Sequence, residues 1–241
     1  MKSFIRALGR EAESRAAALA TNRGGGTATL YFGGGTPSML SDTHLGHLME
    51  TLDRLVPVDK LDEFSFEANP ATFTEKKVRF WRSLGMTRVS LGVQSLDSGI
   101  LHLLGREHTP AQALHSVEML KNAGMPHINM DLMFAIPGQT LSIWEATLKE
   151  AVRAGTDHIS AYNLTYEEDT EFFRSLLRGE KRQDPDEDAA FFELAEHMLE
   201  AAGLRHYETS NYAREGCISP HNMAYWKGED YVGIGPGAVS T

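Results

Sequence analysis

The residues best suited to chemistry begin with a glycine-rich loop, YFGGGTPS, at residues 31–38. The loop follows an apolar run and precedes Ser41-Asp42, a pair typical of a helix start. Successive glycines let a ligand approach the backbone, and exposed amide groups suit a carboxylate or another anion. The loop matches neither a P-loop nor a dinucleotide-binding turn. The alternative interpretation is an ordinary tight turn.

Three further polar residues, Glu67, Gln94 and Asp131, fall at or near the carboxyl ends of successive predicted strands. Their side chains can hydrogen-bond hydroxyl groups, an amino group or an adenine edge. Alternatively, they satisfy one another at the mouth of a barrel, or Glu67 and Asp131 form the acid-base pair of an unrelated barrel enzyme. Arg106 follows Gln94 and could bind a ligand carboxylate through two hydrogen bonds, although a surface salt bridge is the commoner role.

Strand-like runs alternate with helix-like runs along the chain, which predicts crossover connections and a parallel sheet. Four predicted helices end in a glycine that is followed three residues later by Arg or His, a pattern typical of a left-handed helix cap before a strand. We expect strands at residues 27–32, 63–67, 88–93, 127–134 and 158–166, and a weaker one at 206–210.

The same turns predict the roles of three histidines. His127, His158 and His206 fall at the amino ends of strands, whereas ligands of parallel α/β folds lie at the carboxyl ends. We therefore expect these histidines to be structural rather than a set of metal ligands.

The polar faces of three strands indicate the kind of barrel. Aromatic or aliphatic residues alternate with polar or small ones at 63–67, 88–94 and 127–134. This pattern suggests an open or partial barrel whose lumen holds a ligand. A closed barrel of eight strands needs about 250 residues, and five or six strands fit this chain better.

The composition limits the class of protein. The chain has 241 residues, of which 41% are hydrophobic and 23% charged, which predicts a globular protein of one large domain or two small ones. With 33 acidic and 23 basic side chains the formal charge is -10, so we do not expect a nucleic-acid partner. The single cysteine, Cys217, excludes a disulfide and any site that needs several thiolates from these residues. No apolar run predicts a signal peptide or membrane span, so we expect a cytoplasmic protein.

A family resemblance emerges from the order of the motifs across residues 31–240. In this order, they resemble the radical-SAM proteins of the coproporphyrinogen III oxidase group (HemN/HemW). The motifs are GGGTPS, FEANP, SLGVQSLDSGILHLLGREH, INMDLMFAIPGQT, YNLTYEEDT, HYETSNYA, HNMAYW and GIGPGA.

This resemblance implies a partial (βα)6 TIM-like barrel of the radical-SAM type, here lacking its first strand. Residues 1–170 would form the barrel core, and residues 171–241 a later helix, a strand and a motif-rich tail. The family binds S-adenosylmethionine at a 4Fe-4S cluster, held by a Cys-x3-Cys-x2-Cys loop, and cleaves it to a 5'-deoxyadenosyl radical. The resemblance implies that S-adenosylmethionine is contacted by Gly34, Gly35, Thr36, Glu67, Gln94, Arg106, Asp131, Thr165 and Val239.

Within the group, the EANP, HYETSNYA and HNMAYW motifs look more like the haem chaperone branch, which implies haem binding and delivery to an acceptor protein. Oxygen-independent coproporphyrinogen III oxidase, acting by oxidative decarboxylation on a tetrapyrrole, is the alternative, and a clusterless haem- or SAM-binding module is another. His221 and Cys217 are the candidate haem ligands. For His221 a structural or pocket-lining role is favoured, and Cys217 is more often incidental.

The departure from the family is large, because its three cluster cysteines and its C-terminal domain are absent from these residues. Without the cysteines no electron reaches S-adenosylmethionine, so this chain alone is predicted to be inactive. We interpret the sequence as truncated. A missing first strand would also leave the 27–32 strand with an open edge, which predicts an oligomeric or less stable product.

Overall fold

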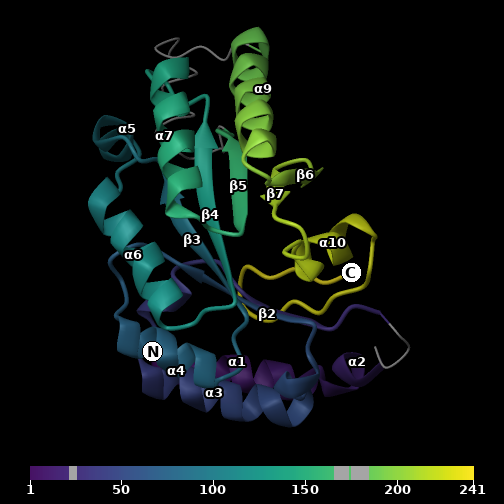
Figure 1. The fold of residues 1–241 in the computed structure, drawn as a ribbon. Coiled ribbons are helices and arrows are strands. Elements are labelled where there is room, and N and C mark those ends of the chain that lie inside the picture. Colours follow the sequence, from purple (N-terminus) through teal and green to yellow (C-terminus); the bar gives the residue numbers. More distant parts are fainter. Residues whose placement is uncertain (22–25, 166–173, 175–184) are drawn as a thin grey trace. The chain divides into compact units, whose positions relative to one another are not determined.

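The computed structural model describes residues 1–21, 26–165, 174 and 185–241. Strands and helices alternate through most of this length (Figure 1). The strands are β1 Thr29–Phe32, β2 Glu63–Ala68, β3 Arg88–Gln94, β4 His127–Phe134, β5 His158–Asn163, β6 Arg205–Glu208 and β7 Asn211–Ala213. The helices are α1 Lys2–Ser14, α2 Ala16–Thr21, α3 Asp42–Leu55, α4 Glu75–Ser83, α5 Ser98–Leu103, α6 Pro110–Asn122, α7 Leu141–Ala154, α9 Pro185–Ala201 and α10 Pro220–Trp226.

The 7-stranded sheet has the order β1-β2-β3-β4-β5-β7-β6. The pairs β1-β2 and β4-β5 are parallel, with Thr29 opposite Glu63 and Asn129 opposite His158. The prediction of a wholly parallel sheet of five or six strands is wrong at its last element. The expected strand at 206–210 is a hairpin of β6 and β7, and β7 runs antiparallel to both β5 and β6. A hairpin needs only a short turn. No helical pattern therefore separates β6 from β7 in the sequence to indicate two strands.

The helix-to-strand turns are confirmed. Gly85, Gly124, Gly155 and Gly203 all have a positive φ, between 65° and 90°, where a side chain would strain the backbone. The basic residue that follows lies at the first or second position of β3, β4, β5 or β6.

The chain divides into two compact units. Unit 1 comprises residues 1–90, 118–126 and 219–241, and unit 2 comprises residues 91–117 and 127–218. No helix among the residues described is long and apolar enough to cross a membrane.

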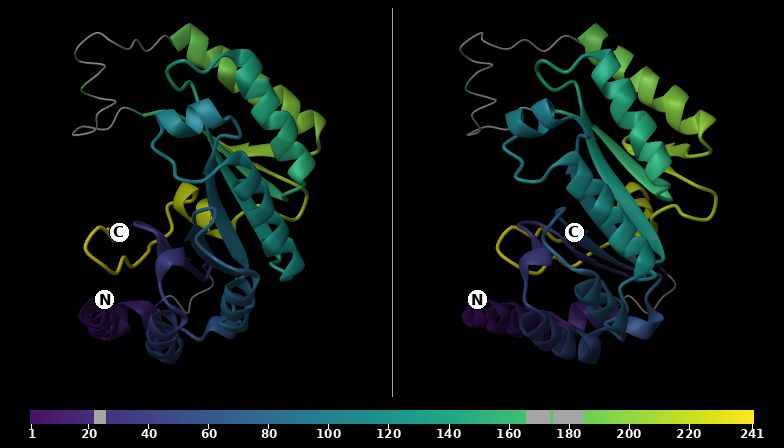
Figure 2. Two further views of the ribbon diagram at one scale, coloured as in Figure 1. Left: turned by 90° about the vertical axis from the view of Figure 1, so that its left-hand side faces the viewer. Right: turned by 60° about the vertical axis from the view of Figure 1, so that its left-hand side comes forward.

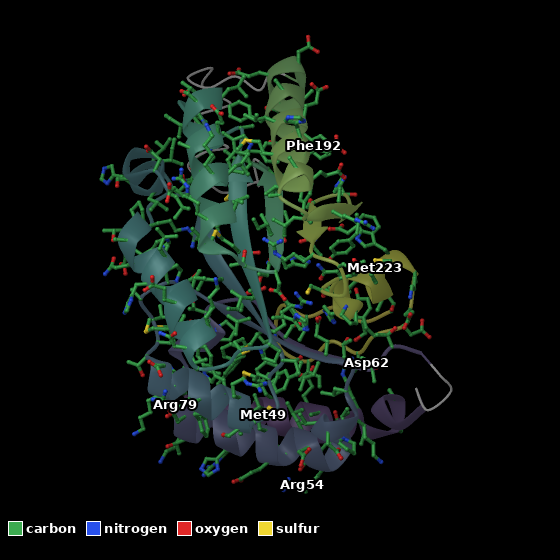
Figure 3. The ribbon with its side chains drawn as sticks, viewed as in Figure 1. Met49, Arg54, Asp62, Arg79, Phe192 and Met223 are labelled. Atoms are coloured by element: carbon green, nitrogen blue, oxygen red, sulfur yellow. The ribbon has the colours of Figure 1, made fainter. Side chains whose placement is uncertain are left out.

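Unit 1 is built around aromatic side chains of β2 and α4. Phe64, Phe66 and Trp81 are fully buried, and the Phe66 and Trp81 rings lie 4.8 Å apart. The helix α3 is amphipathic: Met49 is 4% exposed, whereas the Arg54 side chain is 66% exposed (Figure 3). These apolar contacts fix β1 and β2, whose far ends carry the glycine loop and Glu67.

Unit 2 is held by α7 and α9, which lie side by side in both views of Figure 2. The Trp144 indole N–H of α7 donates a hydrogen bond to the Phe191 carbonyl of α9 over 3.0 Å, and the ring of Phe134 in β4 packs 5.7 Å from Trp144. The apolar face of β4 is thereby buried, which leaves Asn129 and Asp131 on its other face.

Candidate functional site

The glycine loop of unit 1 follows β1 directly and is tied to the segment after β2. The Asn69 amide donates to Thr36 Oγ1 over 3.3 Å, and the Asn69 backbone N–H donates to Ser38 Oγ over the same distance. Gly34 has φ +81°, and a side chain at Gly35 would meet no atom within 4 Å. Hydrogen bonds therefore fix the loop at Thr36 and Ser38, whereas the space beside Gly35 is open.

Glu67 is the charged group closest in sequence to the end of β2, and its carboxylate is held against this loop. The Tyr31 hydroxyl and the Gly34 backbone N–H both donate hydrogen bonds to it. Burial raises the pKa of the Glu67 carboxyl above its ordinary value, although both hydrogen bonds act in the opposite direction. This carboxylate can accept hydrogen bonds from an ammonium or hydroxyl group of a ligand.

Gly33 is required by packing rather than by its backbone angles. A Cβ atom there would lie 2.4 Å from the Tyr31 ring and 2.8 Å from Glu67 Oε1. The first glycine of the loop therefore makes room for the Tyr31–Glu67 pair, and the second adopts a left-handed conformation. Each glycine has a separate physical reason.

An aromatic cluster lies beside β1 in the same unit. The His221 ring stacks on the Tyr31 ring with centroids 4.7 Å apart and an interplanar angle of 4°, and Tyr225 meets His221 edge-on at 5.1 Å. His221 Nδ1 hydrogen-bonds Thr29 Oγ1 over 2.8 Å, and burial lowers the pKa of His221 below its ordinary value. Tyr225 and Trp226 are 49% and 57% exposed. The cluster thus combines an oriented imidazole with exposed flat rings.

Unit 2 brings together Asp131 and Arg106. Asp131 Oδ1 accepts a hydrogen bond from the Asn129 amide over 2.7 Å. Burial lowers the pKa of Arg106, and the charge of Asp131 acts to raise it, so the two charged groups are neighbours. The charge of Asp131 also adds to burial in raising the pKa of the Tyr162 hydroxyl. This pair offers a cation and an anion to a polar ligand.

The other predicted contact residues are more dispersed. Gln94 is the last residue of β3 and has φ +67°, an uncommon value for a residue with a side chain. Thr165 is exposed two residues after β5, and Val239 is 70% exposed near the carboxyl terminus. Cys217 is half-buried between β7 and α10. The sequence prediction missed Tyr31 and Asn69, although both stand inside motifs that it singled out.

Comparisons with known proteins show which sequences and structures this chain resembles. The model of the Radical SAM superfamily matches residues 9–151. The chain is 37% identical over 211 residues to the mitochondrial radical S-adenosyl methionine domain-containing protein 1 of Danio rerio, covering 87% of this chain and 48% of that protein. It is also 37% identical over 212 residues to the heme chaperone HemW of Bacillus subtilis (strain 168), covering 87% of this chain and 56% of that protein. The chain thus spans about half the length of the curated relatives it matches.

A solved structure shows the same fold. Coproporphyrinogen III oxidase (HemN) from Escherichia coli superposes with a TM-score of 0.81 at 22% sequence identity, over 99% of this chain and 57% of that chain. The prediction of a partial TIM-like barrel of the radical-SAM type is confirmed by this match.

Proposed function

The chain belongs to the radical SAM superfamily, within its HemN/HemW-like group, and from that premise we propose that it is the core of a haem chaperone. Such a protein binds haem and passes it to an acceptor protein. Support comes from the heme chaperones HemW of Bacillus subtilis and Lactococcus lactis, both 37% identical to this chain. Because the chain spans about half of each, the activity of the whole protein is part of the proposal.

The stacking of His221 on Tyr31 is the observation that carries the haem assignment. A neutral imidazole is a common haem ligand, and the lowered pKa of His221 keeps its ring neutral near pH 7. Thr29 holds Nδ1, and Nε2 has no hydrogen-bond partner in the part of the chain that the structure describes. Flat rings at Tyr225 and Trp226 suit the face of a porphyrin. We therefore assign His221, rather than Cys217, as the haem ligand, in place of the structural role that the sequence favoured.

S-adenosylmethionine is the second proposed ligand, and the residues present fit its polar groups. In unit 1, the loop amides of Gly34, Gly35 and Thr36 suit a carboxylate, and Glu67 suits an ammonium group. The bound cofactor would present a methionine part and an adenosyl part to these residues. The remaining proposed contacts are Gln94, Arg106, Asp131 and Thr165 in unit 2, and Val239 in unit 1.

Arg106 and Asp131 are proposed to act on this ligand in different ways. The guanidinium group of Arg106 can bind a carboxylate through two parallel hydrogen bonds. Asp131, oriented by Asn129, can accept hydrogen bonds from a pair of ribose hydroxyls.

The 4Fe-4S cluster of the superfamily does not fit the residues present. Such a cluster is held by several cysteine thiolates, and the 241 residues contain Cys217 alone. That cysteine lies after β7, and its sulfur lies within 4.8 Å of a ligand atom of His127 and of Asp157.

Titration of the purified chain with haem, followed by absorption in the Soret region, tests the leading proposal. We expect His221→Ala to weaken haem binding at least about tenfold, equivalent to 1.4 kcal/mol. Cys217→Ser should leave it unchanged, and His47→Ala, which removes an exposed histidine of α3, is the matched control. Equal haem affinity in the wild type and His221→Ala would exclude the assignment.

The ligand S-adenosylmethionine is tested separately by calorimetry. Glu67→Gln and Arg106→Gln should each weaken its binding without changing haem affinity. If the chain binds haem but not S-adenosylmethionine, the haem chaperone proposal stands and the cofactor contacts do not.

A further inference from the structure

Three side chains that the proposed function does not use meet at the amino ends of β4 and β5. His127 is the first residue of β4, Asp157 directly precedes β5, and Cys217 lies between β7 and α10. One ligand atom from each lies within 4.8 Å of the others, and all three residues are half-buried. All three belong to unit 2, so their arrangement is internal to one compact body.

The backbone around this cluster is fixed by hydrogen bonds. Asp157 Oδ1 accepts the Ile128 N–H over 2.7 Å, and the Asp157 carbonyl accepts the Arg214 N–H over 2.9 Å. The Cys217 N–H then donates to the Arg214 carbonyl over 3.0 Å. The turn that carries the cysteine is therefore anchored to the segment that carries the aspartate, and the three side chains are brought together without a ligand.

The chemistry of the three donors points to a particular class of ion. His127 Nδ1 and Asp157 Oδ2 are hydrogen-bonded over 2.5 Å. Imidazole nitrogen, thiolate sulfur and carboxylate oxygen together are the donors that Zn2+ takes, whereas Ca2+ and Mg2+ take oxygen alone. Zinc bonds of about 2.0–2.3 Å place tetrahedral ligand atoms roughly 3.5 Å apart, a separation that small side-chain movements reach from here.

We propose that His127, Asp157 and Cys217 bind a divalent transition-metal ion of the zinc class. The ion takes the place of the proton between His127 and Asp157 and displaces the thiol proton of Cys217, so that binding releases protons. Three protein ligands leave a fourth position for water.

This cluster is distinct from the proposed cofactor contacts of the same unit. His127 and Asp131 are four residues apart on β4, about 13 Å at the rise of a strand. The two other histidines near strand starts do not contribute to this cluster. His158 is hydrogen-bonded to Asn129 and Tyr207, and His206 stacks on Tyr212. A bound ion would link the first residue of β4 and the turn before β5 to the segment after β7, and so stabilise unit 2 by mass action.

The single cysteine gives a site-specific test. The tag-free chain is titrated with Co2+ and then with Zn2+. We expect thiolate-to-cobalt charge-transfer absorption in the near ultraviolet, lost when Zn2+ displaces the cobalt. Zn2+ should also slow alkylation of Cys217 by iodoacetamide about tenfold or more, as a thiolate bound to metal no longer reacts freely.

Variants separate this site from other binding. Cys217→Ser should abolish the charge-transfer band, and Asp157→Asn should weaken Zn2+ binding about tenfold or more. His102→Gln, which removes an exposed histidine of α5, should change neither result. If Asp157→Asn fails to fold, Cys217→Ser and the alkylation rate of the wild type still decide.

Two results would overturn the proposal: no thiolate band with Co2+, or an alkylation rate that is the same with and without Zn2+. Neither result bears on haem or S-adenosylmethionine binding, which depends on other residues.

Discussion

The hydroxyl group of Tyr31 donates a hydrogen bond to Oε1 of Glu67. Tyr31 pairs with Ser65 in the parallel register of β1 and β2, so Glu67 is two residues further along β2 and its side chain is on the same face as that of Ser65. The Gly34 N–H donates to the same carboxylate. The orientation of Glu67 is therefore set by the protein before any ligand binds.

Replacing Tyr31 by Phe should raise the pKa of Glu67 further, because the hydroxyl hydrogen bond is a cause that lowers it. A carboxyl whose pKa is raised on folding gives stability that is present below its ordinary pKa and lost as the pH rises through its folded value. The stability of Tyr31→Phe should thus fall more than that of the wild type as the pH rises through this range. The loss of the hydrogen bond should cost about 1 kcal/mol of unfolding free energy in all.

Urea unfolding from about pH 4 to pH 8 checks this prediction. Glu67→Gln is the control, because it has no carboxyl at this position and should lack this part of the pH dependence. Parallel stability curves for Tyr31→Phe and the wild type would contradict it.

Alanine at Gly33 and alanine at Gly35 should have different consequences for stability. Gly33→Ala places a methyl group 2.4 Å from the Tyr31 ring and should cost about 1–3 kcal/mol of stability, since the ring and Glu67 must move. Gly35→Ala meets no atom within 4 Å and should leave stability nearly unchanged. If a ligand carboxylate approaches the backbone at Gly35, Gly35→Ala should weaken S-adenosylmethionine binding without changing stability. Thermal melting and calorimetry separate the two effects.

The sequence predicted the local turns of this fold better than its distant contacts. Gly155 and His158 are three residues apart, so a helix cap and a strand start could be recognised in one short window. The β6-β7 hairpin was not predicted, because Thr209 and Ser210 were interpreted as the end of one strand and not as a turn between two. Short, partly exposed strands carry little periodicity.

The candidate site shows the same limit more sharply. Glu67 and Asp131 were predicted from strand alternation, which is local. The stacking of His221 on Tyr31 joins residues far apart in the chain, and neither residue type demands the other. Likewise His127, Asp157 and Cys217 meet only because three turns converge. Such meetings depend on tertiary packing, which periodicity does not encode.

Glu63→Gln should destabilise the protein strongly. Glu63 and Arg88 form an ion pair of 2.6 Å with side chains only 2% and 4% exposed, and Glu63 Oε1 also accepts from Ser65 and Ser219. Removing the Glu63 charge takes away the carboxylate that pairs with the buried guanidinium group of Arg88, which costs about 3–5 kcal/mol. Urea unfolding measures the loss.

Glu145→Gln is the matched control for this substitution. It breaks an exposed pair with Lys149 on α7 and should cost only about 0.3–0.5 kcal/mol. Similar losses for Glu63→Gln and Glu145→Gln would show that the buried pair contributes no more than a surface one.

His221 should make the protein less stable on mild acidification. Burial lowers its pKa, and the weaker effect of Glu63 acts in the opposite direction. A histidine whose pKa is lowered on folding gives stability that is present above its ordinary pKa and lost as the pH falls through that value toward the folded one. The wild type should therefore lose stability between about pH 7.5 and pH 5.

His221→Asn is the matched variant, because its amide nitrogen can keep the hydrogen bond to Thr29 while the side chain stays uncharged. Its stability should fall less than that of the wild type over the same pH range. The lowered pKa also means that protons compete weakly with haem iron for the imidazole, so haem binding by the wild type should persist below pH 6.5. Identical pH dependence in both proteins would show that His221 is not the titrating group, and a loss of haem binding already above pH 6.5 would argue against a neutral imidazole ligand at this position.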